Sequence, residues 1–366
     1  MTTSVTSRTT ALTAKKRGRN RLAGAARLVF LGGLVAITGF TILRRPALDE
    51  AEVALARNDV RKALRLALDD LDTHRRSPES ARIAGRSLSA LLYGGEAEPY
   101  YKIAASQGML SEADRYARVQ GLITSNRPDQ AIAVCREILG KQSGNVAILR
   151  LLAFTHWLRG EFVEAEATAE TLVKTTNGQT DGLGLLAMIH HEAKHPQKAI
   201  LASESLLAID PELKTYRPGA MIFWHDYTDD LVQVHRSADA RRYLEKIPPI
   251  DRGSDLLDIL AFARKELGDT EGAEQAWRES IRRDPSRLNP LLQLGRMLVG
   301  IKRFRDAAEV LERAVKLAPG NLESHYLLSR AYQFLGRESD ADHHRKRAEE
   351  IRRASPAPIG GMGPSK

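Results

Sequence analysis

Residues 288–321 read LNPLLQLGRMLVGIKRFRDAAEVLERAVKLAPGN, and the pattern within these residues decides the fold. Apolar or small side chains fall three and four positions apart in each half: Leu291, Leu294 and Leu298, then Ala307, Leu311 and Ala314. That spacing places each set on one face of a helix. Pro319, in the sequence LAPGN, then closes the stretch. The stretch therefore predicts two short amphipathic helices joined by a turn.

The same pattern recurs along the chain, with an alanine at position 20 of each unit. These alanines are Ala63, Ala97, Ala131, Ala165, Ala199, Ala240, Ala273, Ala307 and Ala341, spaced by 34 except for steps of 41 and 33 around Ala240. Position 8 is small in most units, which allows the two helices to cross closely, and position 15 is often Asn or Gly, which indicates a turn. One such unit cannot bury its apolar face alone, so neighbouring units are expected to stack.

The first 45 residues differ in composition from the rest of the chain. They contain nine Lys and Arg residues and no Asp or Glu. These nine charges equal the formal net charge of +9 of the whole chain of 366 residues, so residues 46–366 are neutral overall. Because the excess positive charge is confined to this segment, the sequence predicts no nucleic-acid partner.

Residues 22–45 predict a transmembrane signal-anchor helix. Leu28–Leu43 carry no charge, and Leu22–Ala26 extend the apolar stretch to 22 residues when the Arg27 side chain reaches the headgroups. The sequence RRP at 44–46 follows in place of a small-residue cleavage site, which favours an anchor over a cleaved signal peptide. More basic residues precede the span than directly follow it, which predicts a cytoplasmic N-terminus and a body outside the cytoplasm, periplasmic in a bacterium.

On the repeated residues, the sequence resembles the tetratricopeptide repeat (TPR) family. Residues 288–321 match well, with Leu294, Gly295, Phe304, Ala307, Ala314 and Pro319. The resemblance implies an all-α fold, a right-handed superhelical solenoid of about nine TPR helix-turn-helix units, preceded by the one transmembrane helix. Pro99 predicts that the second helix of its unit begins late. Arg345 occupies an otherwise apolar position of the last helix, which predicts a polar cap.

The sequence divides the chain into seven segments. We expect a basic disordered tail at 1–21, the anchor at 22–45, divergent TPR-like helices at 46–111, TPR units at 112–213, a divergent unit with an insertion at 214–253, TPR units with a polar C-terminal cap at 254–355, and a disordered tail at 356–366. The insertion brings an aromatic cluster, Tyr216, Phe223, Trp224 and Tyr227. Either a docking site or a bend in the solenoid is consistent with this cluster.

Residues 191–195 read HEAKH, which fits the H-E-x-x-H pattern of zinc metalloproteases. That chemistry needs both histidines on one helical face. In the repeat frame, His191 and Glu192 lie at a solvated helix end, whereas His195 falls in the turn and Pro196 moves it out of helical geometry. Because the sequence also lacks phosphate-loop, hydrolase and dinucleotide motifs, we expect no catalytic residue, no metal and no cofactor. The single cysteine, Cys135, is expected to be a buried core thiol.

The resemblance also implies a binding surface, because the first helices of TPR units line a concave face. Carried onto this sequence, the contact positions give a partner-binding groove of Arg82, Arg86, Tyr116, Gln120, Arg150, Phe154, Trp157, Met188, Phe262, Arg296, Tyr326 and Arg330. Arg150, Phe154 and Trp157 share one face of a helix, where packing between units is the alternative role for both aromatic rings. Aromatic and Arg side chains carry much of the binding energy at protein interfaces.

These features together predict a non-catalytic, membrane-anchored TPR scaffold or adapter. It is expected to bind a protein or peptide partner in the groove, without nucleic acid or a small-molecule substrate, in the assembly or biogenesis of a membrane or envelope complex. The Lys and Asn pair by which some TPR proteins hold chaperone tails is missing, so that class of partner is not expected. Two alternatives stay open: a regulatory adapter that faces the cytoplasm, and a zinc hydrolase that uses the HEAKH segment.

Overall fold

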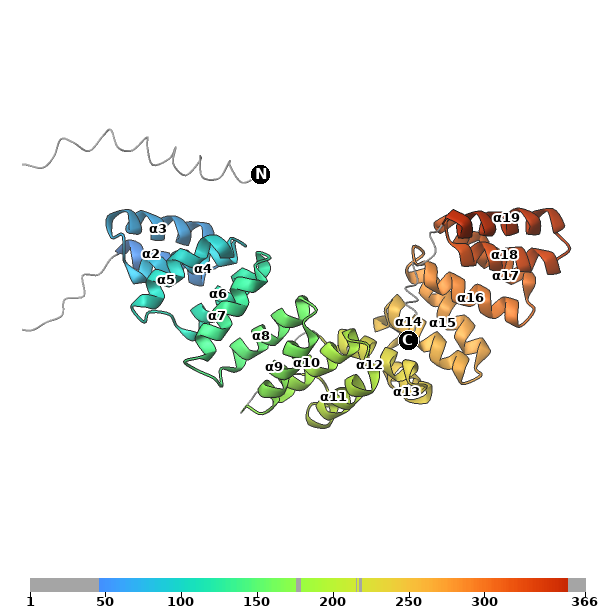
Figure 1. Cartoon of the computed structure of the whole chain (residues 1–366), viewed down its shortest axis with the longest axis horizontal. Coiled ribbons are helices and arrows are strands. Elements are labelled where there is room, and N and C mark those ends of the chain that lie inside the picture. Colours follow the sequence, from blue (N-terminus) through green and yellow to red (C-terminus); the bar gives the residue numbers. More distant parts are fainter. Residues whose placement is uncertain (1–45, 176–178, 215, 217–218, 355–366) are drawn as a thin grey trace, which may run out of the picture. The chain divides into compact units, whose positions relative to one another are not determined.

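The computed structural model of the protein describes residues 46–175, 179–214, 216 and 219–354. These residues form eighteen α-helices, one short 3-10 helix (η1, Pro249–Asp251) and no strand. The helices come in nine pairs, which Figure 1 follows from α2 in blue to α19 in red. The predicted all-α, TPR-like solenoid is therefore confirmed in the part of the chain that the structure describes.

The first helices of the nine pairs are α2 (Pro46–Ala56), α4 (Pro78–Ala90), α6 (Glu112–Thr124), α8 (Val146–Leu158), α10 (Gln179–Glu192), α12 (Ala220–Gln233), α14 (Ser254–Glu266), α16 (Leu288–Gly300) and α18 (Leu322–Phe334). The second helices are α3 (Val60–Thr73), α5 (Gly94–Ser106), α7 (Pro128–Leu139), α9 (Phe162–Val173), α11 (Pro196–Ile209), α13 (Ser237–Lys246), α15 (Thr270–Arg283), α17 (Phe304–Leu317) and α19 (Glu338–Ala354). Each helix packs on the next along the chain, and first helices also pack on one another, as α6 does on α4 and α8.

The nine alanines at position 20 lie where the two helices of a pair meet. All nine are buried, and eight of them have no exposed surface. The small residue at position 8 packs on position 24 of the same unit: a Cβ at Gly295 would lie 2.5 Å from Leu311, and one at Gly85 would lie 3.1 Å from the Tyr101 ring. Close crossing therefore explains why both positions hold small side chains.

Each pair turns at a residue with a positive φ angle at position 15. In five units the turn residue is the Asn or Gly that the sequence indicated, namely Asn58, Asn126, Gly160, Gly268 and Gly336. The other four units use Leu92, Lys194, His235 and Lys302, with φ between 59° and 66°. Leu and Lys disfavour the left-handed conformation, so at Leu92, Lys194 and Lys302 the packing of the flanking helices must impose it.

The prediction that Pro99 delays the second helix of its unit is wrong. Helix α5 begins at Gly94 and continues through Pro99. Its start packs so tightly on α6 that a Cβ at Gly94 would lie 2.1 Å from the carbonyl oxygen of Gly121. Ala97 and Tyr101 of the same helix are fully buried. Burial of this face therefore outweighs the backbone hydrogen bond that proline cannot donate.

Buried apolar residues gather in clusters of unequal size along the stack. One continuous cluster runs from Leu244 on α13 to Ala341 on α19. Toward the N-terminus the clusters are smaller, and one of them is confined to α2, α3 and α4 around Ala51, Ala63 and Ile83. Cys135 is fully buried in the cluster of α6, α7 and α8, as predicted, and burial raises the pKa of its thiol to about 12.

Among the helices in the described ranges, none is both long and apolar enough to cross a membrane. The predicted anchor at 22–45 and the two predicted tails at 1–21 and 356–366 all lie outside the residues that the structure describes. The limits drawn between regular and divergent segments stay predictions.

Replacing Gly94 with alanine should test how tightly the units pack. We expect Gly94→Ala to lower the free energy of unfolding by about 2 kcal/mol, because the new methyl group meets backbone rather than a movable side chain. Gly300→Ala is the matched control, since a Cβ there meets nothing within 4 Å, and it should stabilise by about 0.5 kcal/mol. Urea unfolding followed by circular dichroism measures both changes, and equal midpoints for the two variants would contradict the close approach.

Candidate partner-binding groove

One groove of about 590 Å³ crosses four successive first helices, and we call it the central groove. Its lining residues are Tyr116, Gln120, Ile123 and Thr124 of α6, Arg150, Leu151, Phe154 and Trp157 of α8, Thr180, Asp181, Gly184, Leu185, Met188 and Glu192 of α10, Tyr216, and Ile222 and Asp226 of α12. Six of the twelve residues predicted to bind a partner lie here: Tyr116, Gln120, Arg150, Phe154, Trp157 and Met188.

Helix α8 supplies the aromatic wall of the central groove. The Asn145 side chain caps this helix by accepting a hydrogen bond from the Ile148 amide at 3.0 Å. The rings of Phe154 and Trp157 stack with their centroids 5.4 Å apart and their planes at 27°. Both are half-buried: they pack on the core cluster of α8, α9 and α10 and also line the groove. Packing between units and contact with a partner, the two roles considered for these rings, are therefore compatible.

Arg150 links three of the helices that line the central groove. Its Nη1 atom lies 3.5 Å from Asp181 Oδ2 on α10, and its guanidinium carbon lies 6.0 Å from the centroid of the Tyr116 ring on α6. Both members of the ion pair are partly buried, which reduces screening by water. Arg150 thus holds a fixed position in the groove wall.

The insertion before α12 closes one side of the central groove with Tyr216. This ring lies so near α10 that a Cβ at Gly184 would be 2.8 Å from its Cε2 atom. Burial, followed by the charge of Asp226, raises the pKa of the Tyr216 hydroxyl. The other aromatic residues of the insertion mostly belong to the core, since Phe223 and Tyr227 are buried and Trp224 stacks on Tyr243 at 5.4 Å. Of the four, only Tyr216 therefore lines the groove.

The HEAKH segment does not lie on one helix. Helix α10 ends at Glu192, Lys194 has a φ of 59°, and His195 precedes the first residue of α11. The two histidines therefore do not share the helical face that the zinc chemistry requires. In the described ranges, no three His, Cys, Asp or Glu residues are grouped so that they could hold a metal ion.

The expectation that His191 sits at a solvated helix end is wrong, although Glu192 is exposed there. His191 is only 8% exposed, and its Nδ1 atom lies 3.0 Å from Oδ1 of the equally buried Asp230 on α12. Its Nε2 atom lies 3.6 Å from Asp226 Oδ1, which is also 2.9 Å from Nδ1 of His225. The hydrogen bond and charge of Asp230, with the further charges of Asp226 and Asp229, raise the pKa of His191.

The other six predicted residues lie elsewhere. Arg82 and Arg86 each lie 3.5 Å from the buried carboxylate of Asp114, Phe262 packs edge-on against Trp277, and Arg296 pairs with Glu323. Tyr326 and Arg330 line a second groove, of about 840 Å³, between α18 and α19. Of the predicted set, six residues therefore line the central groove, two line the second groove and four line neither, and their role in binding stays a prediction.

Sequence reasoning missed several residues of the central groove. Asp181 and Ile222 occupy the second position of their units. Because this is one of the contact positions of TPR units, the repeat pattern itself offered a signal for both residues. Tyr216 was named in the aromatic cluster of the insertion, for which a docking site was one alternative, but it was not assigned to the groove because no repeat position applies there. Its place beside Gly184 is visible only once the chain is folded.

Comparison with known proteins supports the repeats. The tetratricopeptide repeat family matches residues 122–189, 260–321 and 292–341. The C-terminal part of a TPR repeat-containing protein from Cytophaga hutchinsonii is 15% identical, with 66% of this chain and 96% of that chain covered and a TM-score of 0.53. This likeness shows the fold alone.

Two further solved structures are similar over shorter parts of the chain. The MamA protein is 17% identical over 50% of this chain and 100% of its own, with a TM-score of 0.43. YrrB, described as a TPR protein with an unusual peptide-binding site, is 14% identical over 47% and 86%, with a TM-score of 0.40. No curated protein matches the sequence.

The pair of His191 and Asp230 should make stability depend on pH. Because the folded chain holds the His191 proton more tightly than the unfolded chain, this contribution is complete below the ordinary histidine pKa of about 6.5 and is lost as the pH rises through the folded value. We therefore expect the stability of the wild type relative to His191→Gln to fall as the pH rises above about 6.5. Urea unfolding at a series of pH values measures the difference.

His235→Gln is the control for this measurement, because the side chain of His235 is 85% exposed. The difference between the wild type and this variant, measured at the same pH values, gives the baseline. A difference between wild type and His191→Gln that stays constant from pH 5 to pH 9, a range of about two units on either side of an ordinary histidine pKa, would contradict a charged pair. His191→Ala should cost about 3 kcal/mol, because it leaves the buried carboxylate of Asp230 without this donor.

Proposed function

We propose that this protein is a non-catalytic scaffold that binds a segment of a partner protein in the central groove. The observation that carries the proposal is the continuity of this groove over α6, α8, α10 and α12. Stacked helical repeats use such extended surfaces for binding, and TPR proteins generally act as scaffolds. The twofold role of Phe154 and Trp157, in the core and at the surface, gives the groove a rigid aromatic wall.

The lining of the central groove defines the partner segment. Apolar side chains of Ile123, Leu185, Met188 and Ile222 surround the aromatic wall, so the segment presents bulky apolar side chains. Ile222 is 50% exposed and gains most from being covered. Toward α12 the groove carries the carboxylates of Glu192 and Asp226, and a basic side chain of the partner would be attracted there.

Residues 22–45 anchor this scaffold in a membrane in our proposal, with the helical body outside the cytoplasm. The support is the uncharged run of Leu28–Leu43 and the excess of basic residues before it. Confinement at a membrane raises the effective concentration of the groove near membrane complexes, so that modest affinity suffices. Assembly or biogenesis of a membrane or envelope complex is the role that we propose for it.

Crosslinking in the native membrane tests the groove. We expect the wild type to capture a partner and Arg150→Glu/Trp157→Ala to lose it by roughly tenfold or more, since truncation of a central aromatic residue commonly costs over 2 kcal/mol of binding free energy. The arginine change also places a carboxylate beside Asp181. Mass spectrometry of the crosslinked chains measures the capture.

Arg136→Glu/Leu158→Ala is the matched control, because it makes the same kinds of change at exposed positions of α7 and α8 outside the central groove. It should capture the partner as the wild type does. Equal capture by all three proteins would move the binding surface away from the central groove.

Removal of residues 1–45 should release the helical body from the membrane fraction into the soluble fraction, which fractionation and immunoblotting measure. A truncated body that stays with the membrane would disprove the anchor.

A topology reporter fused after Ser365 should be active outside the cytoplasm. Activity inside the cytoplasm would favour the alternative of a regulatory adapter that faces the cytoplasm.

A further inference from the structure

The groove between α18 and α19, which we call the terminal groove, is the face on which another repeat would stack. In the preceding unit, the corresponding face of α16 and α17 is covered by α18. Shifting the lining of the terminal groove back by 34 residues gives a set in which Leu292, Val299, Leu311 and Ala314 are buried in one core cluster with α18, whereas Arg296 and Gly300 are exposed. Within the ranges that the structure describes, no helix follows α19 to cover this face.

Two aromatic side chains of the terminal groove are exposed. Tyr326 replaces Leu292 and is 58% exposed where Leu292 is 8% exposed. Phe334, which is 59% exposed, stacks on Phe304 with one face at a centroid distance of 4.4 Å. These rings leave a large apolar surface in water, which is typical of an interaction site.

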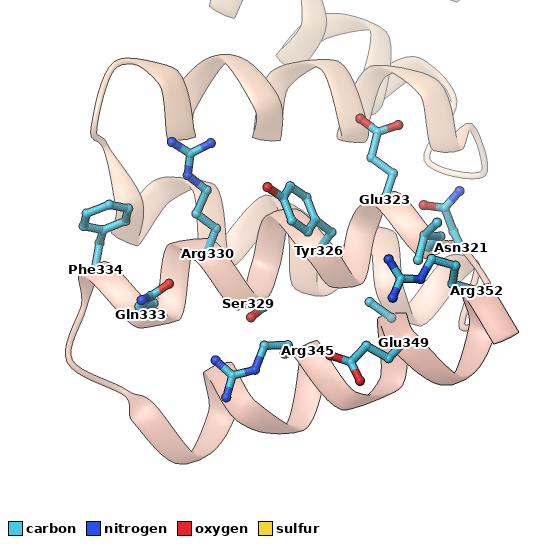
Figure 2. A pocket seen from close by; sticks show the side chains of 12 residues that line it. Asn321, Glu323, Tyr326, Ser329, Arg330, Gln333, Phe334, Arg345, Glu349 and Arg352 are labelled. Carbon is cyan, nitrogen blue, oxygen red and sulfur yellow. The ribbon is translucent and has the colours of Figure 1, made fainter.

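The terminal groove is lined by three arginines, Arg330, Arg345 and Arg352, and by two glutamates, Glu323, which pairs with Arg296, and Glu349. Figure 2 shows Tyr326 and Arg330 extending from α18 away from α19, Arg345 lying on α19, and Arg352 beside Asn321 at one end. Arg345 pairs with Asp342, and Glu349 lies 3.5 Å from Arg353. Neither Arg330 nor Arg352 has an ion-pair partner among the residues that the structure describes. Two free guanidinium groups therefore flank the exposed rings.

We propose that the terminal groove binds an acidic amphipathic helix of a partner protein, which stacks on α18 and α19 as α18 stacks on α16 and α17. A helix is the element that covers the equivalent face one unit earlier. Its apolar side chains cover Tyr326, and its carboxylates meet Arg330 and Arg352. This surface is separate from the central groove, since the two share no lining residue.

Other occupants fit the charge less well. Residues 355–366 contain no Asp or Glu and so lack the complementary charge. Helix α2 of a second copy carries Asp49, Glu50 and Glu52, but Glu50 pairs with Lys62 at 2.9 Å and Glu52 pairs with Arg82 within its own chain. A helix with free carboxylates, from another protein, is therefore favoured over a second copy.

Two peptide probes test the assignment on the purified full chain. One is a helical peptide of about four turns with Leu and Ile on one face and Glu on the other, and the second carries Lys in place of every Glu. Fluorescence anisotropy at low salt should show that the acidic probe binds at least roughly tenfold more tightly than the basic probe. Arg330→Glu/Arg352→Glu should remove this preference or reverse it.

Arg313→Glu/Arg347→Glu is the matched control, with the same change in charge at exposed positions of α17 and α19 outside the terminal groove. It should keep the preference of the wild type. Unchanged circular dichroism spectra would show that all variants fold.

Equal binding of the two probes, or a preference that survives Arg330→Glu/Arg352→Glu, would overturn the proposal. Light scattering over a range of concentrations tests the second copy. Association of the wild type that the double variant abolishes, and that the acidic probe competes away, would assign the groove to another copy of this chain and would also overturn it.

Discussion

The close crossing of two helices at small side chains is the constraint on which the whole structure depends. Where position 8 is Gly or Ala and position 20 is Ala, the helices of a pair approach until larger residues at position 24, such as Leu311, fill the remaining space. Because the crossing recurs at the same positions, the first helices stand in register from unit to unit. Groove residues such as Tyr116, Arg150 and Asp181 then come together from units that are separate in sequence.

This register explains why the fold could be predicted from the sequence and where prediction failed. Ala63, Ala131 and their equivalents lie where the two helices of one unit cross, so their burial could be predicted from their spacing in the sequence alone. The left-handed turn at Lys194 could not be predicted from the residue type, because the flanking helices impose it. Likewise, the start of α5 before Pro99 depends on contact with Gly121 of α6, which the local sequence does not contain.

Prediction from the local sequence reached the same limit at the candidate sites. Half of the predicted binding residues line the central groove, because they occupy equivalent positions on neighbouring first helices. His191 was misjudged because its environment is set by Asp230, 39 residues later and beyond the insertion that breaks the spacing. Tyr216 was noted in the aromatic cluster of the insertion, but its place in the central groove could not be assigned for the same reason. Where the repeat is interrupted, three-dimensional contacts decide the site, and the interruption itself supplies part of the groove.

The unequal apolar clusters have a mechanical consequence. The cluster from α13 to α19 joins several units into one body, whereas the units nearest the N-terminus share only small clusters such as that of α2, α3 and α4. Force applied between the two ends of such a linear array acts on each interface in turn, and the interfaces with the least shared apolar surface separate first. Under tension, such an array would be expected to part at the boundaries between clusters, where neighbouring units share less apolar surface.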